Sequence, residues 1–379
     1  MRVSLFVLVA LSIYAAMHLL VYWGVRPLLP RHPAATASAV LWAALMIVAP
    51  VLVRWLAGAE QEAAARGLAW VGYSWAGFLF LAFWLSAALG VWELAAWLLG
   101  KGLPALPPVS LRGPLSAAVL VAVTVGAGLY GFYEAAHLRV ETVPIATAKL
   151  GPGTDRLRIA QVSDLHLGLL HREGALAPVV SRLKELRPDL LVATGDVVDA
   201  QINHLDGLSS LWQEIDPPLG KFAVVGNHEI YAGLGESLDF LRRSGFTVLR
   251  GEGRTVGGAL TLVGVDDDHV RDRVRDEAAL RGARNEGLFT VLLKHRPAVG
   301  EGAAGLFDLQ ISGHTHRGQI FPFRFLTALA YPMQDGLYDL PGGAKVYSSR
   351  GTGTWGPPIR VLSPPEITLF EITRDAAAR

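Results

Sequence analysis

The chain has 379 residues, of which 51% are hydrophobic and 18% charged, and its mean hydropathy is +0.36. This length allows two domains, and this hydropathy excludes an ordinary water-soluble enzyme. The formal net charge of +1 gives no electrostatic basis for nucleic-acid binding, and the count of zero cysteines excludes disulfides and thiolate metal ligands.

The apolar excess is concentrated before residue 137. Four segments there are each close to the roughly 20 apolar residues that a helix needs to cross a bilayer. They cover residues 3–25, 39–56, about 68–89 and 115–136. We therefore expect a transmembrane region of about four helices over residues 1–137.

Two of these segments need a closer look. The first is longer than the 7–15-residue apolar core of a signal peptide and lacks a small-residue cleavage site, so we expect it to be retained as a helix. The third stays apolar nearly to Leu99. Either that helix tilts in the bilayer, or an interfacial helix containing Trp92 and Trp97 follows it.

The orientation of the helices is not specified by charge. An even number of spans puts the N-terminus and the region after the last span on one side of the membrane. That side carries Arg2, Arg54, Arg66 and Arg139, and the other carries Arg26, Arg31, Lys101 and Arg112. Because the positive-inside rule counts such residues, four against four leaves the side open.

Beyond the helices, the polar stretch around Gly151-Pro152-Gly153 predicts a linker over residues 138–156. Short β-branched runs then alternate with helical segments such as 175–186 and 235–244, which is typical of an α/β fold. No G-x-x-x-x-G-K motif occurs, which argues against nucleotide-driven work.

Polar segments follow five of the apolar runs. They are Asp164-Leu165-His166 after 157–162, Gly195-Asp196 after 190–194, Gly226-Asn227-His228-Glu229 after 222–225, Lys294-His295 after 290–293, and Gly313-His314-Thr315-His316 after 309–311. Such runs are typical of buried strands followed by loops. Since ligand sites lie beyond the carboxyl ends of strands in α/β sheets, we expect these side chains to converge.

The residue types indicate a two-metal centre. Asp, His and Asn without Cys suit Mn, Fe, Zn or Mg. Two ions about 3.5–4 Å apart can share a carboxylate and hold the attacking and leaving oxygens of a displacement at phosphorus, and Asp196 is the best candidate for the shared group. Taken alone, residues 226–229 could be a turn and the pair His314 and His316 a surface pair. The five segments together, in this order, favour the metal centre.

The order D-x-H, G-D-x-x-D, G-N-H-E, H and G-H-x-H resembles the calcineurin-like metallophosphoesterase superfamily over about residues 157–372. The resemblance implies a four-layer α/β/β/α sandwich over residues 157–373. It implies one metal held by Asp164, His166, Asp196 and His316, and a second held by Asp196, Asn227, His295 and His314.

The same resemblance implies that His228 is not a ligand but the acid that protonates the leaving oxygen, oriented by Asp199. Histidine suits this role because its ordinary pKa lies close to neutral pH. The expected reaction is hydrolysis by a metal-bridging hydroxide attacking phosphorus in line with the departing oxygen. The expected cofactors are two divalent ions, with Mn first and Fe, Zn or Mg as alternatives.

Arginine side chains could bind the substrate, because their planar forks fit phosphate oxygens. The candidates are Arg317, Arg350 and Arg360, and the alternative for each is a solvated surface arginine. The acidic run Asp266-Asp267-Asp268 before His269 matches no ligand position, so we expect a solvated loop there. We expect Glu229 to orient the metal ligands from behind.

The N-terminal spans and the ending from Ser349-Arg350-Gly351 to Pro364-Pro365-Glu366 look like a bacterial membrane-bound subgroup, similar also to transmembrane proteins with a metallophosphoesterase domain. This implies a multi-pass protein of the bacterial inner membrane that cleaves a phosphoester or pyrophosphate, with a lipid-linked substrate favoured. One alternative is a UDP-2,3-diacylglucosamine pyrophosphohydrolase of lipid A synthesis. Another is a non-catalytic metal-binding membrane sensor.

Overall fold

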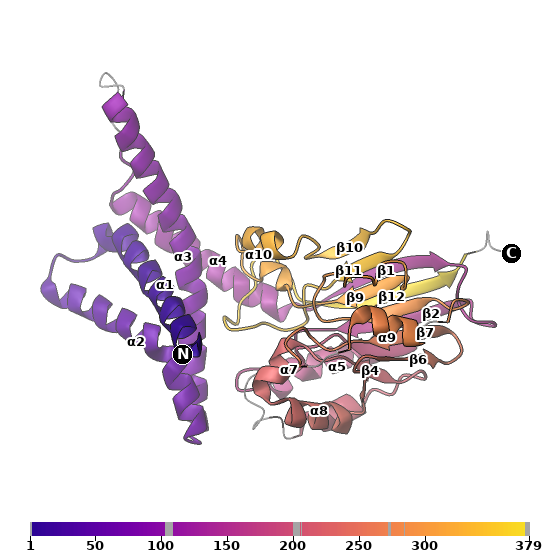
Figure 1. Ribbon diagram of the computed structural model, residues 1–379. Helices are drawn as coiled ribbons and strands as arrows, with labels where there is room; N and C mark the ends of the chain where they lie inside the picture. Colours follow the sequence, from indigo (N-terminus) through magenta and orange to yellow (C-terminus); the bar gives the residue numbers. More distant parts are fainter. Residues whose placement is uncertain are drawn as a thin grey trace. The chain divides into compact units, whose positions relative to one another are not determined.

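The computed structural model describes residues 2–102, 109–199, 205, 207–271, 274–283 and 285–375 (Figure 1). The chain forms two compact units. A helical unit comprises Met1–Tyr133 and the loop Gly356–Val361, and a second unit comprises Glu134–Trp355 and Leu362–Arg379.

The helical unit contains the four helices that the sequence predicts. They are α1 (Arg2–Val25), α2 (Pro33–Gly58), α3 (Glu62–Gly102) and α4 (Pro114–Ala136), and a short 3-10 turn, η1 (Arg26–Leu28), follows α1. Each of the four is long and apolar enough to cross a membrane. The third is one uninterrupted helix of 41 residues, so the segment with Trp92 and Trp97 continues the same helix and is not a separate one.

Small residues on α3 let its neighbours approach closely. Ala65, Ala69 and Gly72 are all buried, and a Cβ added at Gly72 would lie 3.1 Å from the Cβ of Ala49 on α2. Helices in lipid associate through such close backbone contacts, because burial of apolar surface there gives no net driving force for association. The outward residues are large and apolar, as a lipid-facing surface requires, with Leu41 72% and Leu115 80% exposed.

The C-terminal part of α3 makes polar contacts. The Glu93 carboxylate accepts hydrogen bonds from Ser110 Oγ at 2.8 Å and from the N–H groups of Leu111 and Arg112 at 2.7 and 2.9 Å. The Arg112 guanidinium also lies 4.9 Å from the centre of the Trp23 ring. Because charged groups are costly in hydrocarbon, these contacts favour a position outside it for this end of α3.

The second unit is built on two six-stranded sheets. The first runs in the order β1 (Arg139–Thr147), β12 (Glu366–Arg374), β2 (Arg156–Val162), β3 (Leu190–Ala193), β4 (Lys221–Ala223) and β5 (Thr247–Val248). The second runs β10 (Gly336–Asp339), β11 (Lys345–Ser348), β9 (Leu309–Ser312), β8 (Thr290–Leu293), β7 (Leu260–Gly264) and β6 (Glu252–Val256). All residues of β3, β8 and β9 are buried, as expected for strands covered on both faces.

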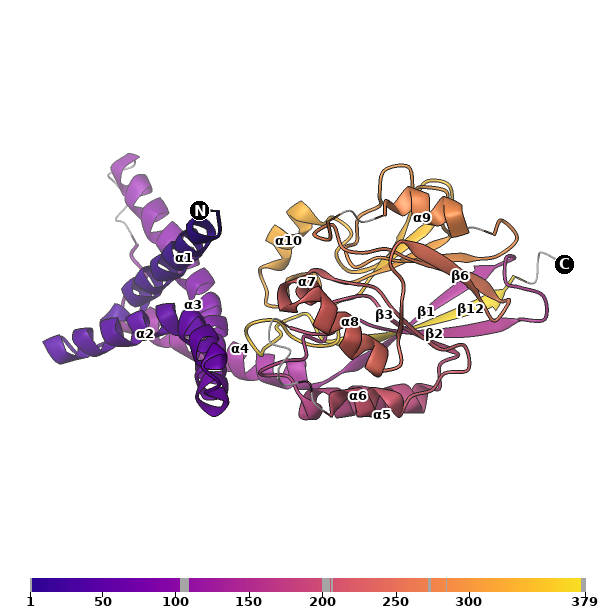
Figure 2. The same ribbon diagram turned by 60° about the horizontal axis from the view of Figure 1, so that its bottom comes forward.

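Helices cover the outer face of each sheet, which confirms the four-layer α/β/β/α prediction (Figure 2). Apolar side chains such as Ile159 from the first sheet and Leu262 from the second fill the space between the sheets. On the first sheet lie α5 (Glu173–Leu186), α6 (Leu208–Gln213) and α8 (Leu234–Arg243), and on the second lies α9 (Asp276–Ala283). The predicted helices at 175–186 and 235–244 correspond to α5 and α8.

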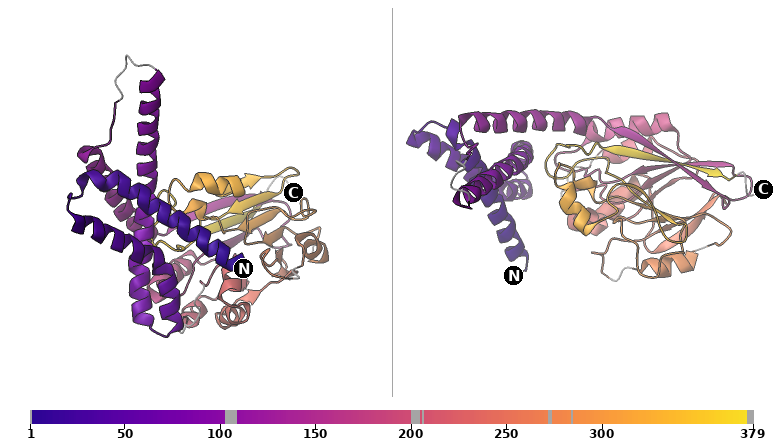
Figure 3. Two further views of the ribbon diagram at one scale, coloured as in Figure 1. Left: turned by 60° about the vertical axis from the view of Figure 1, so that its left-hand side comes forward. Right: turned by 90° about the horizontal axis from the view of Figure 1, so that it is seen from above.

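The expected linker over residues 138–156 contains a strand. β1 runs parallel to β12 with nine residue pairs, from Arg139 opposite Glu366 to Thr147 opposite Arg374. It carries Pro144, which cannot donate to a neighbouring strand and is tolerated because β1 is the outermost strand of its sheet. The right-hand view of Figure 3 shows β1 beside β12 in this sheet.

Candidate metal centre

The predicted ligands all follow strands, at the edge where the strands end. Asp164 and His166 follow β2, and Asp196 follows β3; Asn227 and His228 open α7 (Asn227–Ala232) after β4; His295 follows β8; His314 and His316 follow β9. Because β2 to β4 belong to one sheet and β8 and β9 to the other, the site requires both sheets.

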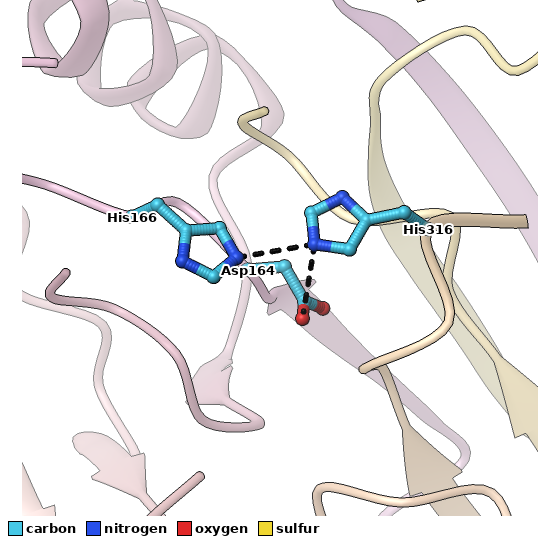
Figure 4. Close-up of side chains that lie close together, drawn as sticks. All are labelled: Asp164, His166 and His316. Atoms are coloured by element: carbon cyan, nitrogen blue, oxygen red, sulfur yellow. Dashed lines mark hydrogen bonds and ion pairs between the residues drawn. The ribbon is translucent and has the colours of Figure 1, made fainter. Parts of the chain in front are cut away.

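One cluster consists of Asp164, His166 and His316, whose side chains point toward one another in Figure 4. His166 Nε2 lies 3.1 Å from His316 Nε2, which in turn lies 3.6 Å from Asp164 Oδ1. All three residues are buried. The Asp164 carboxylate also accepts the backbone N–H of His314 at 3.0 Å, which joins this cluster to the loop after β9.

A second cluster gathers around His295. Its Nε2 lies 3.2 Å from Asp196 Oδ2, 3.2 Å from Asn227 Oδ1 and 3.1 Å from His314 Nδ1. Its other nitrogen, Nδ1, donates to the carbonyl oxygen of Thr194 at 2.8 Å. This bond fixes the tautomer in which the Nε2 lone pair points into the cluster.

Asp196 lies between the two clusters. The Asp196 carboxylate forms one group with His295 and His314 and another with His166 and His228. Within each group, the side-chain atoms that could bind a metal lie within 4.8 Å of one another. This position would allow the carboxylate to be shared by two ions.

The donor atoms fit divalent cations. With metal–ligand bonds of about 2.0–2.2 Å, neighbouring ligand atoms in octahedral or tetrahedral sites lie roughly 2.8–3.6 Å apart. The measured separations of 3.1 to 3.6 Å match this range. Buried His166 Nδ1 has no hydrogen-bond partner among the described residues, so its ring is not satisfied by the protein alone.

Burial sets the charge of the cluster. It lowers the pKa values of His166 and His314 to about 3, with neighbouring cationic side chains adding to the effect, so both rings are neutral and can bind a metal. It raises the pKa of Asp164 to about 6. Burial alone would lower the pKa of His295, but the carboxylates of Asp196 and Asp164 raise it to about 10. These carboxylates therefore attract positive charge to this position.

The backbone at five of the expected ligands is left-handed. The φ angles are +54° at Asp164, +53° at His166, +51° at Asp196, +72° at His314 and +47° at His316. Such conformations cost on the order of 1–3 kcal/mol each outside glycine and gather at functional sites. Among the described residues, five of the ten non-glycine residues with positive φ are therefore expected ligands.

Glu229 supports the site from behind, as predicted in outline. Its carboxylate accepts N–H groups from Asp196 at 2.8 Å, Val197 at 2.7 Å, Val198 at 3.2 Å and Gly226 at 2.8 Å. One buried side chain thereby connects the loop after β3 with the loop after β4.

We expect Glu229→Gln to lower the unfolding temperature of the full chain. The amide that replaces one carboxylate oxygen cannot accept, so about two charge-assisted hydrogen bonds are lost, at roughly 1.5–3 kcal/mol each. Thermal unfolding in detergent measures the shift, and Glu236→Gln on the exposed face of α8 is the matched control. Equal unfolding temperatures for the two variants would contradict the role of Glu229.

His228 and Asp199 are brought together as the sequence predicts. His228 Nδ1 lies 2.9 Å from Asp199 Oδ1, and the His228 backbone N–H donates to Asp196 Oδ1 at 2.8 Å. Burial acts to lower the pKa of His228, but the hydrogen bond to Asp199 and the charge of Asp196 outweigh it and raise the pKa. The rings of Tyr231 and Trp355 lie 5.4 and 5.7 Å from the His228 ring.

The three arginines differ in their surroundings. Arg317 follows the ligand His316 and lies 3.0 Å from Asp335. Arg350 is paired with Glu141 and Glu366, each at 2.5 Å. Arg360 is fully buried within the loop assigned to the helical unit. Arg350 is therefore occupied by carboxylates and Arg360 is not a solvated surface arginine, so Arg317 stays the candidate phosphate ligand.

A further arginine was not singled out by sequence. Arg296 donates to Asp267 Oδ2 at 2.6 Å and to the Tyr331 hydroxyl at 2.6 Å, and the Tyr331 ring lies 5.1 Å from the His314 ring. Asp266 and Asp267 are 5% and 3% exposed, so the expected solvated loop is wrong for these two residues. The basic run Lys294-His295-Arg296 was the available signal.

Comparison with known proteins agrees with this geometry. The family model of calcineurin-like phosphoesterases matches residues 157–318. A metallophosphoesterase of Aquifex aeolicus is 42% identical over 259 residues, which is 67% of this chain and 98% of the relative. One from Bacillus subtilis is 31% identical over 279 residues, covering 69% and 96%. A zebrafish (Danio rerio) transmembrane protein with a metallophosphoesterase domain is 34% identical over 278 residues, covering 68% and 62%.

Proposed function

The chain belongs to the calcineurin-like metallophosphoesterase family, a family of metal-dependent phosphoester hydrolases, and on that basis we propose that it is a membrane-anchored phosphodiesterase with two divalent cations. The observation that carries the proposal is the position of Asp196 between two buried clusters of ligand side chains. The full proposed ligand set is Asp164, His166, Asp196 and His316 for one ion, and Asp196, Asn227, His295 and His314 for the other. Mn is the expected metal.

Bound divalent cations would activate water and neutralise phosphate oxygens. The protein's own contribution begins with His228. Because Asp199 occupies Nδ1 at 2.9 Å, the exchangeable proton of a protonated His228 lies on Nε2. From there it can pass to the leaving oxygen as the phosphoester bond breaks. Tyr231 and Trp355 pack around the ring and restrict its rotation.

The substrate that we propose is a lipid-linked phosphoester or pyrophosphate in the bacterial inner membrane. Four helices able to span a bilayer support this choice, because they confine the enzyme to the surface where such substrates are concentrated. UDP-2,3-diacylglucosamine is one such pyrophosphate and stays an alternative substrate.

Full-length protein in detergent, supplied with manganese and bis-p-nitrophenyl phosphate, tests the reaction class. We expect metal-dependent release of p-nitrophenol, which Asp196→Ala removes and the exposed-site variant Asp239→Ala retains. If the protein hydrolyses no phosphoester with Mn, Fe, Zn or Mg, the alternative function of a non-catalytic metal-binding sensor is favoured.

A second experiment tests the substrate. The same protein is incubated with UDP-2,3-diacylglucosamine, nucleotide diesters and glycerophospholipids, and products are identified by mass spectrometry. UMP release selects the pyrophosphohydrolase alternative, and cleavage of the glycerophospholipid selects a lipid phosphodiesterase. Cleavage of the nucleotide diesters alone would rule out a lipid-linked substrate.

A further inference from the structure

An apolar surface follows the last metal ligands in the chain. The helix α10 (Arg324–Ala330) has no buried residue, and in Figures 1 and 2 it lies beyond the strand ends, not over a sheet face. The residues that form what we term the α10 surface are Phe321 (39% exposed), Phe323 (44%), Phe325 (61%), Leu326 (47%) and Leu329 (82%).

A helix with this composition needs an apolar environment. Its sequence, RFLTALA, has one charged residue, Arg324, and one hydroxyl, Thr327, whose Oγ1 donates to the Phe323 carbonyl oxygen of the same segment at 3.3 Å. Helices that are apolar on all sides are normally buried in a core or a membrane. A contiguous set of large, exposed apolar side chains marks a binding surface.

The composition favours a bilayer as the occupant of this surface. Phenylalanine and leucine beside a single arginine are typical of segments at the headgroup–acyl boundary, where apolar rings enter the acyl region and the guanidinium meets lipid phosphates. The same chain carries four helices long and apolar enough to span a membrane, so a bilayer is within the chain's own reach. The Thr327 hydroxyl already donates a hydrogen bond within its own segment. The surface has no other uncharged polar side chain that could bond to a protein partner.

Hydrogen bonds hold α10 to the metal ligands. Thr315, which lies between the ligands His314 and His316, donates its hydroxyl to the carbonyl oxygen of Gln334 at 2.7 Å. Gln334 Nε2 in turn donates to the carbonyl oxygen of Arg324 at 3.1 Å. The depth of α10 in a membrane would therefore set the position of the ligand loop.

A second connection runs to the proposed proton donor. The side-chain amide of Gln319 donates to the Trp355 carbonyl oxygen at 3.0 Å and accepts the Trp355 N–H at 2.8 Å. Trp355 is 55% exposed, and its ring lies 5.7 Å from that of His228. An exposed aromatic ring thus stands between His228 and the segment that leads to α10.

We propose that the α10 surface inserts into the headgroup–acyl boundary of the bilayer and holds the metal centre at the level of the lipid phosphates. The insertion does not depend on the proposed reaction. If both hold, substrates whose phosphorus lies at headgroup depth reach the ligands without leaving the membrane.

The count of zero cysteines makes single-site labelling direct. Full-length Phe325→Cys and Leu329→Cys, each carrying a nitroxide label, are reconstituted in nanodiscs of phosphatidylcholine and phosphatidylglycerol. The control is Val274→Cys, at an apolar residue of the second unit that is 42% exposed and beside Gly251. Collision rates with oxygen, which enters the acyl region, and with a water-soluble nickel chelate are measured by electron paramagnetic resonance.

We expect the ratio of oxygen to nickel accessibility at positions 325 and 329 to exceed that at position 274 by at least about fivefold, as for labels below the headgroups. Equal ratios at the three positions would overturn the proposal. Labels at 325 and 329 that are shielded from both reagents would also overturn it, because they would indicate a protein contact.

A charge placed on the α10 surface provides a second measurement. In Leu329→Glu, we expect the oxygen-to-nickel ratio of a label at Phe325→Cys to fall to the control value, while hydrolysis of bis-p-nitrophenyl phosphate stays within about twofold of the unmodified chain, since Leu329 is exposed and outside the ligand set. An unchanged ratio would count against insertion. A chain that hydrolyses no phosphoester yet gives the expected label ratios would reject the proposed function and leave the insertion standing.

Discussion

Replacement of Asp196 by alanine is expected to remove both metal ions and abolish turnover together. Its carboxylate lies 3.2 Å from His295 Nε2 in one cluster and groups with His166 of the other within 4.8 Å, so the side chain is placed to serve both. A loss of several kcal/mol of transition-state stabilisation corresponds to a fall of at least about 10³-fold in kcat/KM. Hydrolysis of a soluble phosphodiester and metal content per chain measure the two effects.

Two further variants serve as controls for this expectation. Asp239→Ala removes an exposed carboxylate on α8 and is expected to keep both metals and full activity. Asp164→Ala removes a ligand of one cluster only and is expected to lose one metal per chain. An Asp196→Ala protein that still binds two metals would contradict a shared carboxylate.

His228→Ala is expected to keep both metals and lose rate. General acid catalysis contributes typically about 10²–10⁴-fold, and it matters most when the leaving group is a poor one. Turnover of an alkyl phosphodiester should therefore fall by that factor, while a p-nitrophenyl diester, whose leaving group needs little protonation, should be affected far less. Parallel kcat measurements on the two substrates test this expectation.

The neighbours of His228 sharpen the test. Asp199→Asn keeps the size of the side chain but weakens its bond to Nδ1, so we expect a smaller loss with the same dependence on the leaving group. Tyr231→Phe keeps the ring beside His228 and is expected to leave both substrates unaffected. A His228→Ala protein with an unchanged rate on the alkyl diester would remove His228 from the role of acid.

The ligand loops could be predicted because the information is local. A buried strand, a turn residue and a polar ligand follow one another within a few positions, as in residues 190–196, and the choice of His, Asp and Asn indicates the metal chemistry directly. The four membrane helices were predictable for the same reason, since length and apolar composition decide them.

Features that depend on distant partners could not be predicted in this way. Residues 139–147 form a strand because they pair with residues 366–374, and nothing near them in sequence announces that partner. The same holds for Arg350, which pairs with Glu141, 209 positions away. The planar guanidinium of Arg350 could bind a phosphate, but in the folded chain it is paired with carboxylates instead.

The uninterrupted α3 has a mechanical consequence. At 1.5 Å per residue its 41 residues extend about 60 Å, twice the roughly 30 Å of bilayer hydrocarbon. For all of α3 to lie within that layer, the helix would have to tilt by about 60° from the bilayer normal, well outside the usual 0–40°. If α3 crosses this layer within the usual range of tilt, about half of the rod would lie beyond the hydrocarbon, and the polar contacts of Glu93 favour its C-terminal end as that part. A change of about 10° in tilt would swing that end sideways by roughly 5 Å, so α3 can act as a lever that converts bilayer thickness into displacement.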